Sequence, residues 1–496
     1  MAASGHYMPL PSLPGTAQLA EAQCACTAVT PARKRSTIDE TEGTMPLTQE
    51  LGRFVASLRF ERLPAEAVEI ARTGIIDTVA TMIAGAHDPA PQLLRRGLAP
   101  APGPASLYFS GEGAAAPEAA WINGTAGHAL DYDDVGCRGH VSTVLLPAIL
   151  AEAETLGAGG REMFAAYVAG YETWAELARR DPGHHHVKGW HPTGIFGAIG
   201  AGAACAALRR LSPEQATMAI ALAASQAGGI MANFGTMTKP FHAGRAAHAG
   251  VVSARLASLG FTAAADALEH PQGFLSAVSP EGRADREGPV PPLGEEWQIV
   301  RQGISIKKYP ACYCTHRALD GMLDLLAKRP LKPAEIARIT AAISRTHSVI
   351  LRNHAPQTGL EAKFSMEFAM AAAVIARRAG LGEYTDTFVR RPEVQELMGK
   401  VTITTNENYD PDVSGASVWD QVTVELVNGE RIESDKVRRA RGHAERPLSE
   451  HELFDKFRTC LDSGHARLSP ERLFDRLRRL ENITARELTA TGSGDR

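Results

Sequence analysis

A long series of helical patterns between residues 48 and 260 constrains the fold more than any other feature of the sequence. The first pattern consists of apolar residues at spacings of seven, four and three, namely Val68, Ile75, Val79 and Met82. This spacing places them on one face of a helix that begins near Pro64. Similar patterns occupy residues 143–157, 161–180, 194–210, 212–228 and 242–259. Because alanine and glycine are abundant and aromatic residues make up only 6%, we predict an all-α core of close-packed helices.

The pattern changes after residues 270–300, which are rich in proline, glycine and charge and which we interpret as a linker or a surface loop. Beyond it, apolar residues alternate as they do in strands. The predicted strands lie at 337–345, at 401–405 and, as a hairpin that turns at Asn428-Gly429, within 421–434. Helical patterns lie between them at 315–328 and 361–378, and return at 448–488.

These patterns predict a mainly α protein with more than one domain, since 496 residues exceed a single ordinary core. We expect a large all-helical domain from residues 45–300 together with 441–496, and a smaller α+β lid domain from residues 301–440. Residues 1–44 are rich in proline, serine, alanine and threonine and show no apolar period. We predict a disordered extension there.

Charge and cysteine content exclude several classes of protein. The net charge is −4 and the basic residues form no long block, so we expect no nucleic-acid surface. No run approaches the ~20 apolar residues of a membrane span, and residues 1–44 lack the apolar run of a secretory signal. The seven cysteines are odd in number and scattered, which disfavours a disulfide framework. We therefore expect a cytoplasmic protein.

The stretch Trp121–His140 begins as a helix, ends in acidic residues and reaches a histidine after a short loop. Acids at the carboxyl end of a helix are disfavoured by its dipole, so Asp131 is not there for the helix. A carboxylate and an imidazole so close in sequence form a candidate acid/base pair, Asp131 with His140. The alternative interpretation is a solvated loop after a helix.

Four more places carry polar residues that the local pattern does not require. His191 precedes an Ala/Gly-rich helix, where backbone N–H groups and the positive dipole end favour its neutral form. Lys239, His242 and Arg245 lie within one stretch of seven residues. Lys307 opens the predicted lid, and Lys363 lies in the stretch that opens an Ala/Met-rich helix. The alternatives are a capping histidine for the first place and surface charge clusters for the others.

Together these residues suggest proton abstraction beside a carboxylate, without a cofactor. Ammonium groups bind carboxylates and stabilise negative charge that builds up on them, and Asp and His transfer protons near neutral pH. No phosphate-binding loop and no G-x-S-x-G motif occurs. The predicted catalytic residues are Asp131, His140, His191, Lys239 and Lys307, and the predicted substrate-binding residues are His242, Arg245 and Lys363.

We expect no metal site. The two Cys-x-Cys pairs, at 24/26 and 312/314, lack the two-residue gap usual for zinc and lie far apart in sequence. Three adjacent histidines, 184–186, point in different directions and rarely bind one ion together.

Five motifs resemble the MmgE/PrpD family over about residues 45–480: GTAGHALDYDDV, GWHPTG, MTKPFHAGRAAHAGVVSARLASLGF, IKKYPACYCTHRALD and GLEAKFSMEFAMA. The family includes 2-methylcitrate dehydratases, cis-aconitate decarboxylases and iminodisuccinate epimerases. The resemblance implies a helical domain with an α+β lid, a homodimer, and no metal or cluster. It also implies an active-site aspartate at Asp131, motif histidines at His140 and His191, and lysines at Lys239 and Lys307.

The sequence departs from the decarboxylase branch at two positions. That branch has a threonine four residues after the aspartate, where this chain has Val135, and a tyrosine where this chain has Phe368. The loop to His140 is also shorter than usual. We therefore expect a small di- or tricarboxylate substrate and a reaction like that of 2-methylcitrate dehydratase. An epimerase, a cis-aconitate decarboxylase and a non-catalytic polycarboxylate-binding protein remain the alternatives.

Overall fold

The computed structural model describes residues 45–406, 408–411 and 415–491. Contacts divide the chain into residues 1–44 and residues 45–496, and the second range is one compact unit. The extension that we predicted for residues 1–44 lies outside the described residues. The rest of this description concerns the second range, which is mainly α-helical as predicted.

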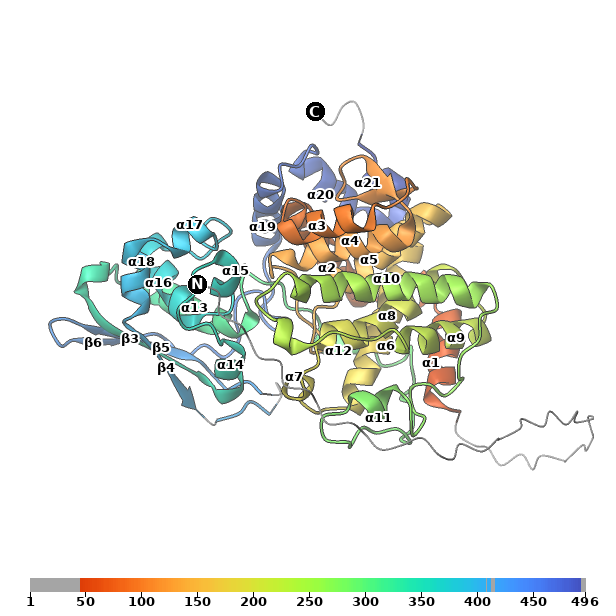
Figure 1. Ribbon diagram of the computed structural model, residues 1–496, viewed down its shortest axis with the longest axis horizontal. Helices are drawn as coiled ribbons and strands as arrows, with labels where there is room; N and C mark the ends of the chain where they lie inside the picture. The colour runs from red at the N-terminus through yellow and green to blue at the C-terminus, as the bar shows by residue number, and fades with distance from the viewer. Residues whose placement is uncertain (1–44, 407, 412–414, 492–496) are drawn as a thin grey trace, which may run out of the picture. The chain divides into compact units, whose positions relative to one another are not determined.

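The first part of this unit is built from helices that pack around one apolar cluster (Figure 1). Its helices are α1 (Leu47–Ser57), α2 (Ala65–Gly85), α3 (Pro89–Leu98), α4 (Ala116–Ala129), α5 (Ser142–Leu156), α6 (Gly160–Arg180), α7 (His185–Lys188), α8 (Pro192–Leu208), α9 (Pro213–Ala224), α10 (Thr238–Ser258), α11 (Phe274–Val278) and α12 (Gln298–Gln302). Helix α10 packs against α4 and α8, and α6 packs against α8. A Cβ on Gly124 would lie only 2.8 Å from the Cα of Gly244, so glycine at this position lets α4 and α10 approach closely.

The predicted all-α core is wrong in one place, because a small hairpin lies between α3 and α4. Strands β1 (Ala105–Leu107) and β2 (Glu112–Ala114) pair antiparallel. Tyr108, Phe109 and Gly111 in the connection have positive φ values of 52°, 59° and 83°. The sequence shows no turn signal before Gly111, and three-residue strands are too short to show an alternating pattern.

A second apolar cluster lies mainly within residues 309–426. It contains a four-stranded sheet of order β4-β3-β5-β6, in which β3 pairs parallel with β4 and antiparallel with β5. The strands are β3 (Ile336–Ser344), β4 (Val401–Asn406), β5 (Gln421–Leu426) and β6 (Arg431–Glu433). The helices are α13 (His316–Lys328), α14 (Arg345–Ile350), α15 (Gly359–Ala362), α16 (Met366–Ala376), α17 (Asp386–Val389) and α18 (Pro392–Met398). The predicted strands and the hairpin turn at Asn428-Gly429 are confirmed.

The helix predicted at 361–378 is interrupted. Ser365 is the N-cap of α16, and its hydroxyl accepts a hydrogen bond of 3.1 Å from the backbone N–H of Phe368. This cap starts a new helix and separates α15 from α16.

The C-terminal segment is helical and packs against the first part of the unit, as predicted. Its helices are α19 (Glu450–Ser463), α20 (Pro470–Arg478) and α21 (Ala485–Thr489). Helix α19 packs against α2, and α21 packs against α5. Five short 3₁₀ helices complete the described chain: η1 (Phe60–Arg62), η2 (Met231–Asn233), η3 (Tyr313–Thr315), η4 (Pro333–Glu335) and η5 (Leu480–Asn482).

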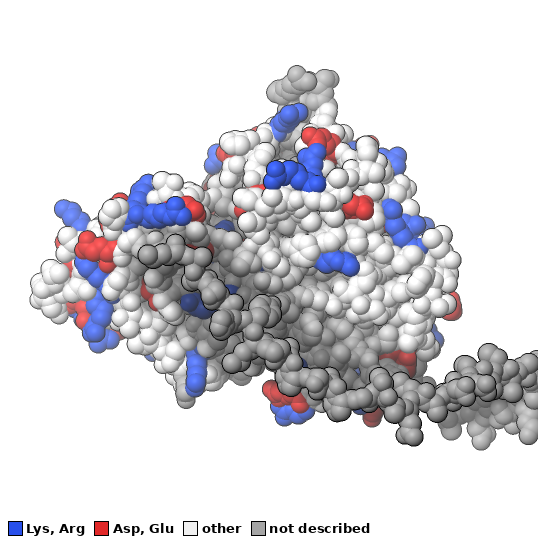
Figure 2. All heavy atoms as spheres, in the orientation of Figure 1, with Lys and Arg blue, Asp and Glu red and all other residues white. Residues whose placement is uncertain are grey.

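The surface carries both charges. On the face shown in Figure 2, basic and acidic side chains are interspersed, and the surface over α10 is mostly uncharged. Within the described residues, none of the helices combines the length and the apolar character that a bilayer crossing requires.

Candidate active site

The end of α4 places an unusual aspartate at the centre of the site. Leu130 caps the helix, and Asp131 follows with a left-handed φ of 50°. A left-handed backbone is costly for a residue with a Cβ, although aspartate tolerates it better than most residues do. Asp131 is 4% exposed, so a carboxylate is buried beside the negative end of a helix dipole. Such a group needs nearby cations.

Two lysines supply them. Lys239 Nζ and Lys307 Nζ each lie 2.8 Å from Asp131 Oδ1, and Lys307 Nζ also donates to the Asp131 carbonyl at 2.8 Å. Burial opposes ionisation of Asp131, but the two ammonium groups outweigh it and hold the pKa of the carboxyl well below 3.8. The second oxygen, Oδ2, is buried and has no hydrogen-bond partner among the described residues.

Different elements deliver the two lysines. Lys239 lies in the first turn of α10, the helix that approaches α4 closely at Gly124. Lys307 follows an isolated bridge in which the backbones of Val135 and Ser305 exchange hydrogen bonds of 2.9 and 2.8 Å. This bridge fixes the loop after Asp131 to the segment that carries Lys307.

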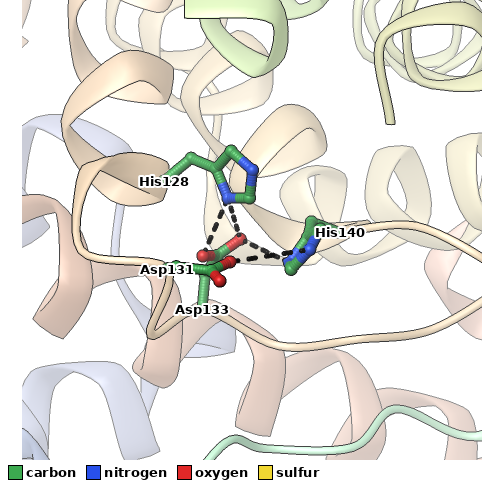
Figure 3. Close-up of side chains that lie close together, drawn as sticks. All are labelled: His128, Asp131, Asp133 and His140. Atoms are coloured by element: carbon green, nitrogen blue, oxygen red, sulfur yellow. Dashed lines mark hydrogen bonds and ion pairs between the residues drawn. The ribbon is translucent and has the colours of Figure 1, made fainter. Parts of the chain in front are cut away.

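Asp133 lies between His128, in the last turn of α4, and His140, at the end of the loop (Figure 3). His128 Nδ1 lies 2.9 Å from both Asp133 oxygens, and His140 Nδ1 lies 3.1 Å from Asp133 Oδ2. Burial lowers the pKa of His128 to about 3, in spite of the attraction of Asp133. Burial also lowers the pKa of His140; Asp133 opposes this, and Lys307 and Lys239 add to it. His140 Nε2 faces Asp131 Oδ1 at 3.9 Å.

His191 occupies the N-cap position of α8 but its side chain makes no capping hydrogen bond. The simple interpretation as a capping histidine is therefore wrong. Its Nδ1 lies 3.2 Å from His242 Nδ1, so one ring donates to the other. Burial and the charge of Lys239 hold the pKa of His191 well below 6.5, and burial lowers that of His242 to about 4. Both rings are therefore neutral at pH 7.

These groups surround a cavity of about 130 Å³. Its lining residues come from both apolar clusters and from the loop after α4: Asp131, Val135, Arg138, Gly139, His140, His186, His191, Thr193, Phe234, Lys239, Lys307, Cys312, Tyr313, Cys314, Ile350 and Phe364. A small cavity with two ammonium groups, a carboxylate and neutral imidazoles suits a small polar anion.

The structure brings all five predicted catalytic residues to this cavity. The three predicted substrate-binding residues do not line it. His242 lies behind His191, and Lys363 is buried with its ammonium group on the Leu130 carbonyl. The Cζ atom of Arg245 lies 5.3 Å from the centroid of the Trp121 ring, and its Nη1 contacts His248 Nδ1. Lys239, His242 and Arg245 lie on α10 and point in different directions from its axis, so only Lys239 reaches the cavity.

Family models cover most of the chain. The MmgE/PrpD N-terminal domain matches residues 49–287, and the MmgE/PrpD C-terminal domain matches residues 309–476. The chain belongs to the MmgE/PrpD family. The resemblance of the five motifs is thus confirmed.

Curated relatives of this family member are named cis-aconitate decarboxylases. The protein of Homo sapiens is 30% identical over 357 residues, which are 68% of this chain and 71% of the relative. The protein of Mus musculus is 27% identical over 380 residues, 74% of this chain and 76% of the relative. The protein of Aspergillus terreus is 25% identical over 445 residues, 84% of this chain and 89% of the relative.

The departures from the decarboxylase branch of the family occupy different places. Val135 lines the cavity, whereas Phe368 is fully buried and packs against Tyr384 with ring centroids 5.0 Å apart. The cavity nevertheless contains hydroxyl-bearing side chains, because Thr193 and Tyr313 line it. Sequence reasoning missed these two, since neither belongs to a charged cluster.

Sequence reasoning also missed the role of His128 and Asp133. His128 lies three residues before Asp131, so it is on the face of α4 that meets the same loop. The Nε2 atom of His128 lies at hydrogen-bond distance, 3.0 Å, from Lys239 Nζ. Two histidines and two aspartates within 13 residues, 128–140, are a sequence signal that could have predicted this cluster.

Asp134, the next acid of the loop, is buried and structural. Its oxygens accept hydrogen bonds from the backbone N–H and the hydroxyl of Ser142 at 3.2 and 2.5 Å. Burial raises the pKa of Asp134 to about 8. Between pH 3.8 and about 8, the folded protein keeps a proton that the unfolded chain has already lost. The free energy of unfolding that this group contributes therefore falls as the pH rises through that window.

We predict that Asp134→Asn removes this pH dependence, because an amide of the same shape stays neutral. The free energy of unfolding of the variant relative to wild type should rise by about 1.4 kcal/mol per pH unit between pH 5 and 7. Urea unfolding at both pH values measures it. Parallel pH dependences for the two proteins would show that Asp134 is ionised in the fold.

Four ligand-type side chains come together in the described part of the chain: His128, Asp131, Asp133 and His140, with one atom from each within 4.8 Å of the others. Two ammonium groups already lie on this cluster, at Asp131 Oδ1 and His128 Nε2. A divalent cation there would be repelled by both.

We therefore predict that the protein works without a metal ion. Dialysis against a strong chelator should leave both activity and thermal stability unchanged. Activity that is lost on dialysis and returns with zinc or iron would contradict this prediction.

Proposed function

We propose that the protein is a cofactor-independent lyase of a small di- or tricarboxylate, which transfers a proton at a carbon next to a carboxylate. The observation that carries the proposal is the pair of buried lysines on Asp131 beside the Asp133–His140 pair. Negative charge that develops on the substrate carboxylate needs a cation, and the neighbouring carbon needs a proton carrier. The site offers both within one cavity.

We assign the transfer of this proton to His140. Its Nδ1 faces Asp133 Oδ2 at 3.1 Å, and its Nε2 faces Asp131 Oδ1 at 3.9 Å. A bound polycarboxylate adds negative charge near the ring, which raises its pKa toward the working pH. Asp131 is less suited to act as a base, because two ammonium groups keep it ionised and weakly basic.

The reaction that the relatives favour is decarboxylation. The bond between the substrate carbon and a carboxylate would break, CO₂ would leave, and the electron pair would stay on the substrate beside the lysine-bound carboxylate. Protonated His140 would then deliver its proton to that carbon. Thr193 and Tyr313 supply hydroxyls in the cavity, so the absence of hydroxyls at Val135 and Phe368 no longer counts strongly against this reaction.

Dehydration, which we expected first from the sequence, is the second candidate. It needs one group to take a proton from carbon and another to protonate the departing hydroxide. His140 and His191 line the same cavity and are both present for these tasks. Epimerisation would use the same two histidines, one on each face of the carbon.

A panel of small di- and tricarboxylates, followed by NMR, tests the proposal. Release of CO₂ identifies a decarboxylase, loss of water a dehydratase, and inversion without elimination an epimerase. Binding of the panel without any turnover would leave only the non-catalytic binding protein and would contradict the proposed lyase.

We also propose that residues 301–440 act as a lid, since Lys307, Cys312 and Phe364 reach the cavity from this segment. The boundaries of the two domains, the homodimer and the cytoplasmic location stay predictions from the sequence.

A further inference from the structure

The loop from Asp131 to His140 contains a strained two-residue turn. Gly136 and Gly139 exchange backbone hydrogen bonds of 2.9 and 2.8 Å, so Cys137 and Arg138 form the turn between them. Both have positive φ, 44° and 67°. Turns of this kind normally carry glycine, asparagine or aspartate at both positions, and neither residue here belongs to that set. Strain that persists beside a site often serves that site.

The turn is anchored on one side and open on the other. The Cys137 side chain is 6% exposed, and its carbonyl accepts a hydrogen bond of 3.0 Å from Trp174 Nε1. Arg138, the next residue, is exposed and lines the cavity. Glycine at position 138 would relieve the backbone strain, but it would also remove the guanidinium from the cavity.

Arg138 and the two lysines have different partners for their charged groups. Lys239 and Lys307 share one carboxylate, that of Asp131. Arg138 Nη1 donates only to the carbonyls of Asp181 and Gly183, each at 3.3 Å. Within residues 45–406, 408–411 and 415–491, the guanidinium forms no direct ion pair with a carboxylate, and its Nε and Nη2 make no hydrogen bond; Asp181 attracts its charge from a greater distance.

The charge balance of the lining then calls for a ligand with more than one carboxylate. The cavity is lined by three cationic side chains and one carboxylate, and the two lysines bind that carboxylate together. One substrate carboxylate beside the lysines leaves Arg138 without a carboxylate in the cavity. A guanidinium presents two parallel N–H donors, which match a carboxylate in a bidentate pair.

We propose that Arg138 binds a second substrate carboxylate, remote from the one beside the lysines, and so selects polycarboxylates over monocarboxylates. This inference rests on the proposed function for its substrate class, but it can be tested by binding alone. The strained turn holds the arginine at the cavity for this purpose.

The test compares Arg138→Gly with a matched control, Arg210→Gly. Arg210 is also an exposed arginine with a left-handed φ, 53°, but it follows α8 and pairs with Glu162 at 3.2 Å, away from the cavity lining. Glycine should relieve strain at both positions, so each variant should melt about 1–3 °C higher than wild type. Only Arg138→Gly should lose affinity.

Calorimetric titration with tricarballylate and with pentanoate provides the readout. Arg138→Gly should bind tricarballylate about 10–100-fold more weakly than wild type, the range for a lost charged hydrogen-bond pair. Arg210→Gly should bind it as wild type does. Arg138→Lys, which keeps the charge and the backbone demand but loses the fork, should lie between them. The weaker affinity for pentanoate should be the same in all four proteins.

Tricarballylate binding that is equal in wild type, Arg138→Gly and Arg138→Lys overturns the inference, and so does a wild type that binds no tricarballylate at millimolar concentration. A wild type that binds tricarballylate through Arg138 but turns over no substrate would refute the proposed lyase and leave the inference standing.

Discussion

Lys307→Met should lower kcat/KM by about 10²–10³-fold, the usual cost of one lost contact to charge that develops in the transition state. The variant keeps most of the volume of a fully buried side chain and removes only the ammonium group. Because Lys307 Nζ lies 2.8 Å from Asp131 Oδ1, the same substitution leaves Asp131 with a single cation, Lys239. We expect a lower kcat as well as weaker substrate binding.

The neighbouring lysine provides the control. Lys308 pairs with Glu452 at 2.8 Å and is partly exposed, and it does not line the cavity. Lys308→Met should therefore keep kcat/KM within a few-fold of wild type. Urea unfolding of Lys307→Met separates folding from chemistry, since the variant keeps the buried pair of Asp131 with Lys239. It should unfold cooperatively, as wild type does, and still lose activity. Equal activity of Lys307→Met and wild type would contradict the assignment of the cation.

His140→Gln should lower kcat by about 10²–10⁴-fold, since it removes the group that we propose to carry the proton. Substrate affinity should change less than kcat, because the ring is neutral before the substrate binds. Asp133→Asn should cause a smaller loss, because the ring stays but loses the carboxylate that orients its Nδ1 at 3.1 Å. Because decarboxylation uses protonated His140, loss of that carboxylate should also shift the alkaline limb of the kcat profile to lower pH, since a nearby negative charge raises the pKa of an imidazole.

A second buried pair of histidine and aspartate is the matched control for this prediction. His185 Nε2 lies 3.1 Å from Asp181 Oδ2, and neither residue lines the cavity. His185→Gln should lower stability but keep kcat near that of wild type. If His185→Gln and His140→Gln lost activity to the same extent, the loss would reflect folding rather than proton transfer.

Much of the fold follows from local pattern. Strand β5 alternates buried and half-buried residues, and the residues Val68, Ile75, Val79 and Met82, whose spacing predicted α2, are all buried. Helices α5 and α8 are buried at nearly every residue, so their apolar composition predicts them rather than one apolar face. The hairpin β1–β2 could not be predicted, because its strands have three residues each and its turn relies on left-handed Tyr108 and Phe109. The break between α15 and α16 depends on a capping hydroxyl at Ser365, which competes with a continuous apolar pattern.

The candidate site was predictable where charge stood out against an apolar background. Asp131 follows an apolar helix, Lys239 and Lys307 lie in segments with small or apolar neighbours, and the structure places each ammonium group 2.8 Å from Asp131 Oδ1. Arg138 was not predicted, since nothing in the sequence shows that a glycine-flanked loop turns at that residue. Arg245 was expected at the site from its distance in sequence to Lys239, but six positions along a helix turn it toward Trp121.

Incorporation of solvent deuterium tests the central claim most directly, which is that His140 transfers a proton at a carbon next to a carboxylate. The reaction runs in D₂O with the polycarboxylate that the panel identifies, and NMR locates the label. With wild type, we expect deuterium at that carbon, in the product of decarboxylation or in recovered substrate before dehydration. With His140→Gln, its rate of appearance should fall about 10²–10⁴-fold. Turnover that leaves that carbon unlabelled, or labelling by His140→Gln at the wild-type rate, would contradict the account.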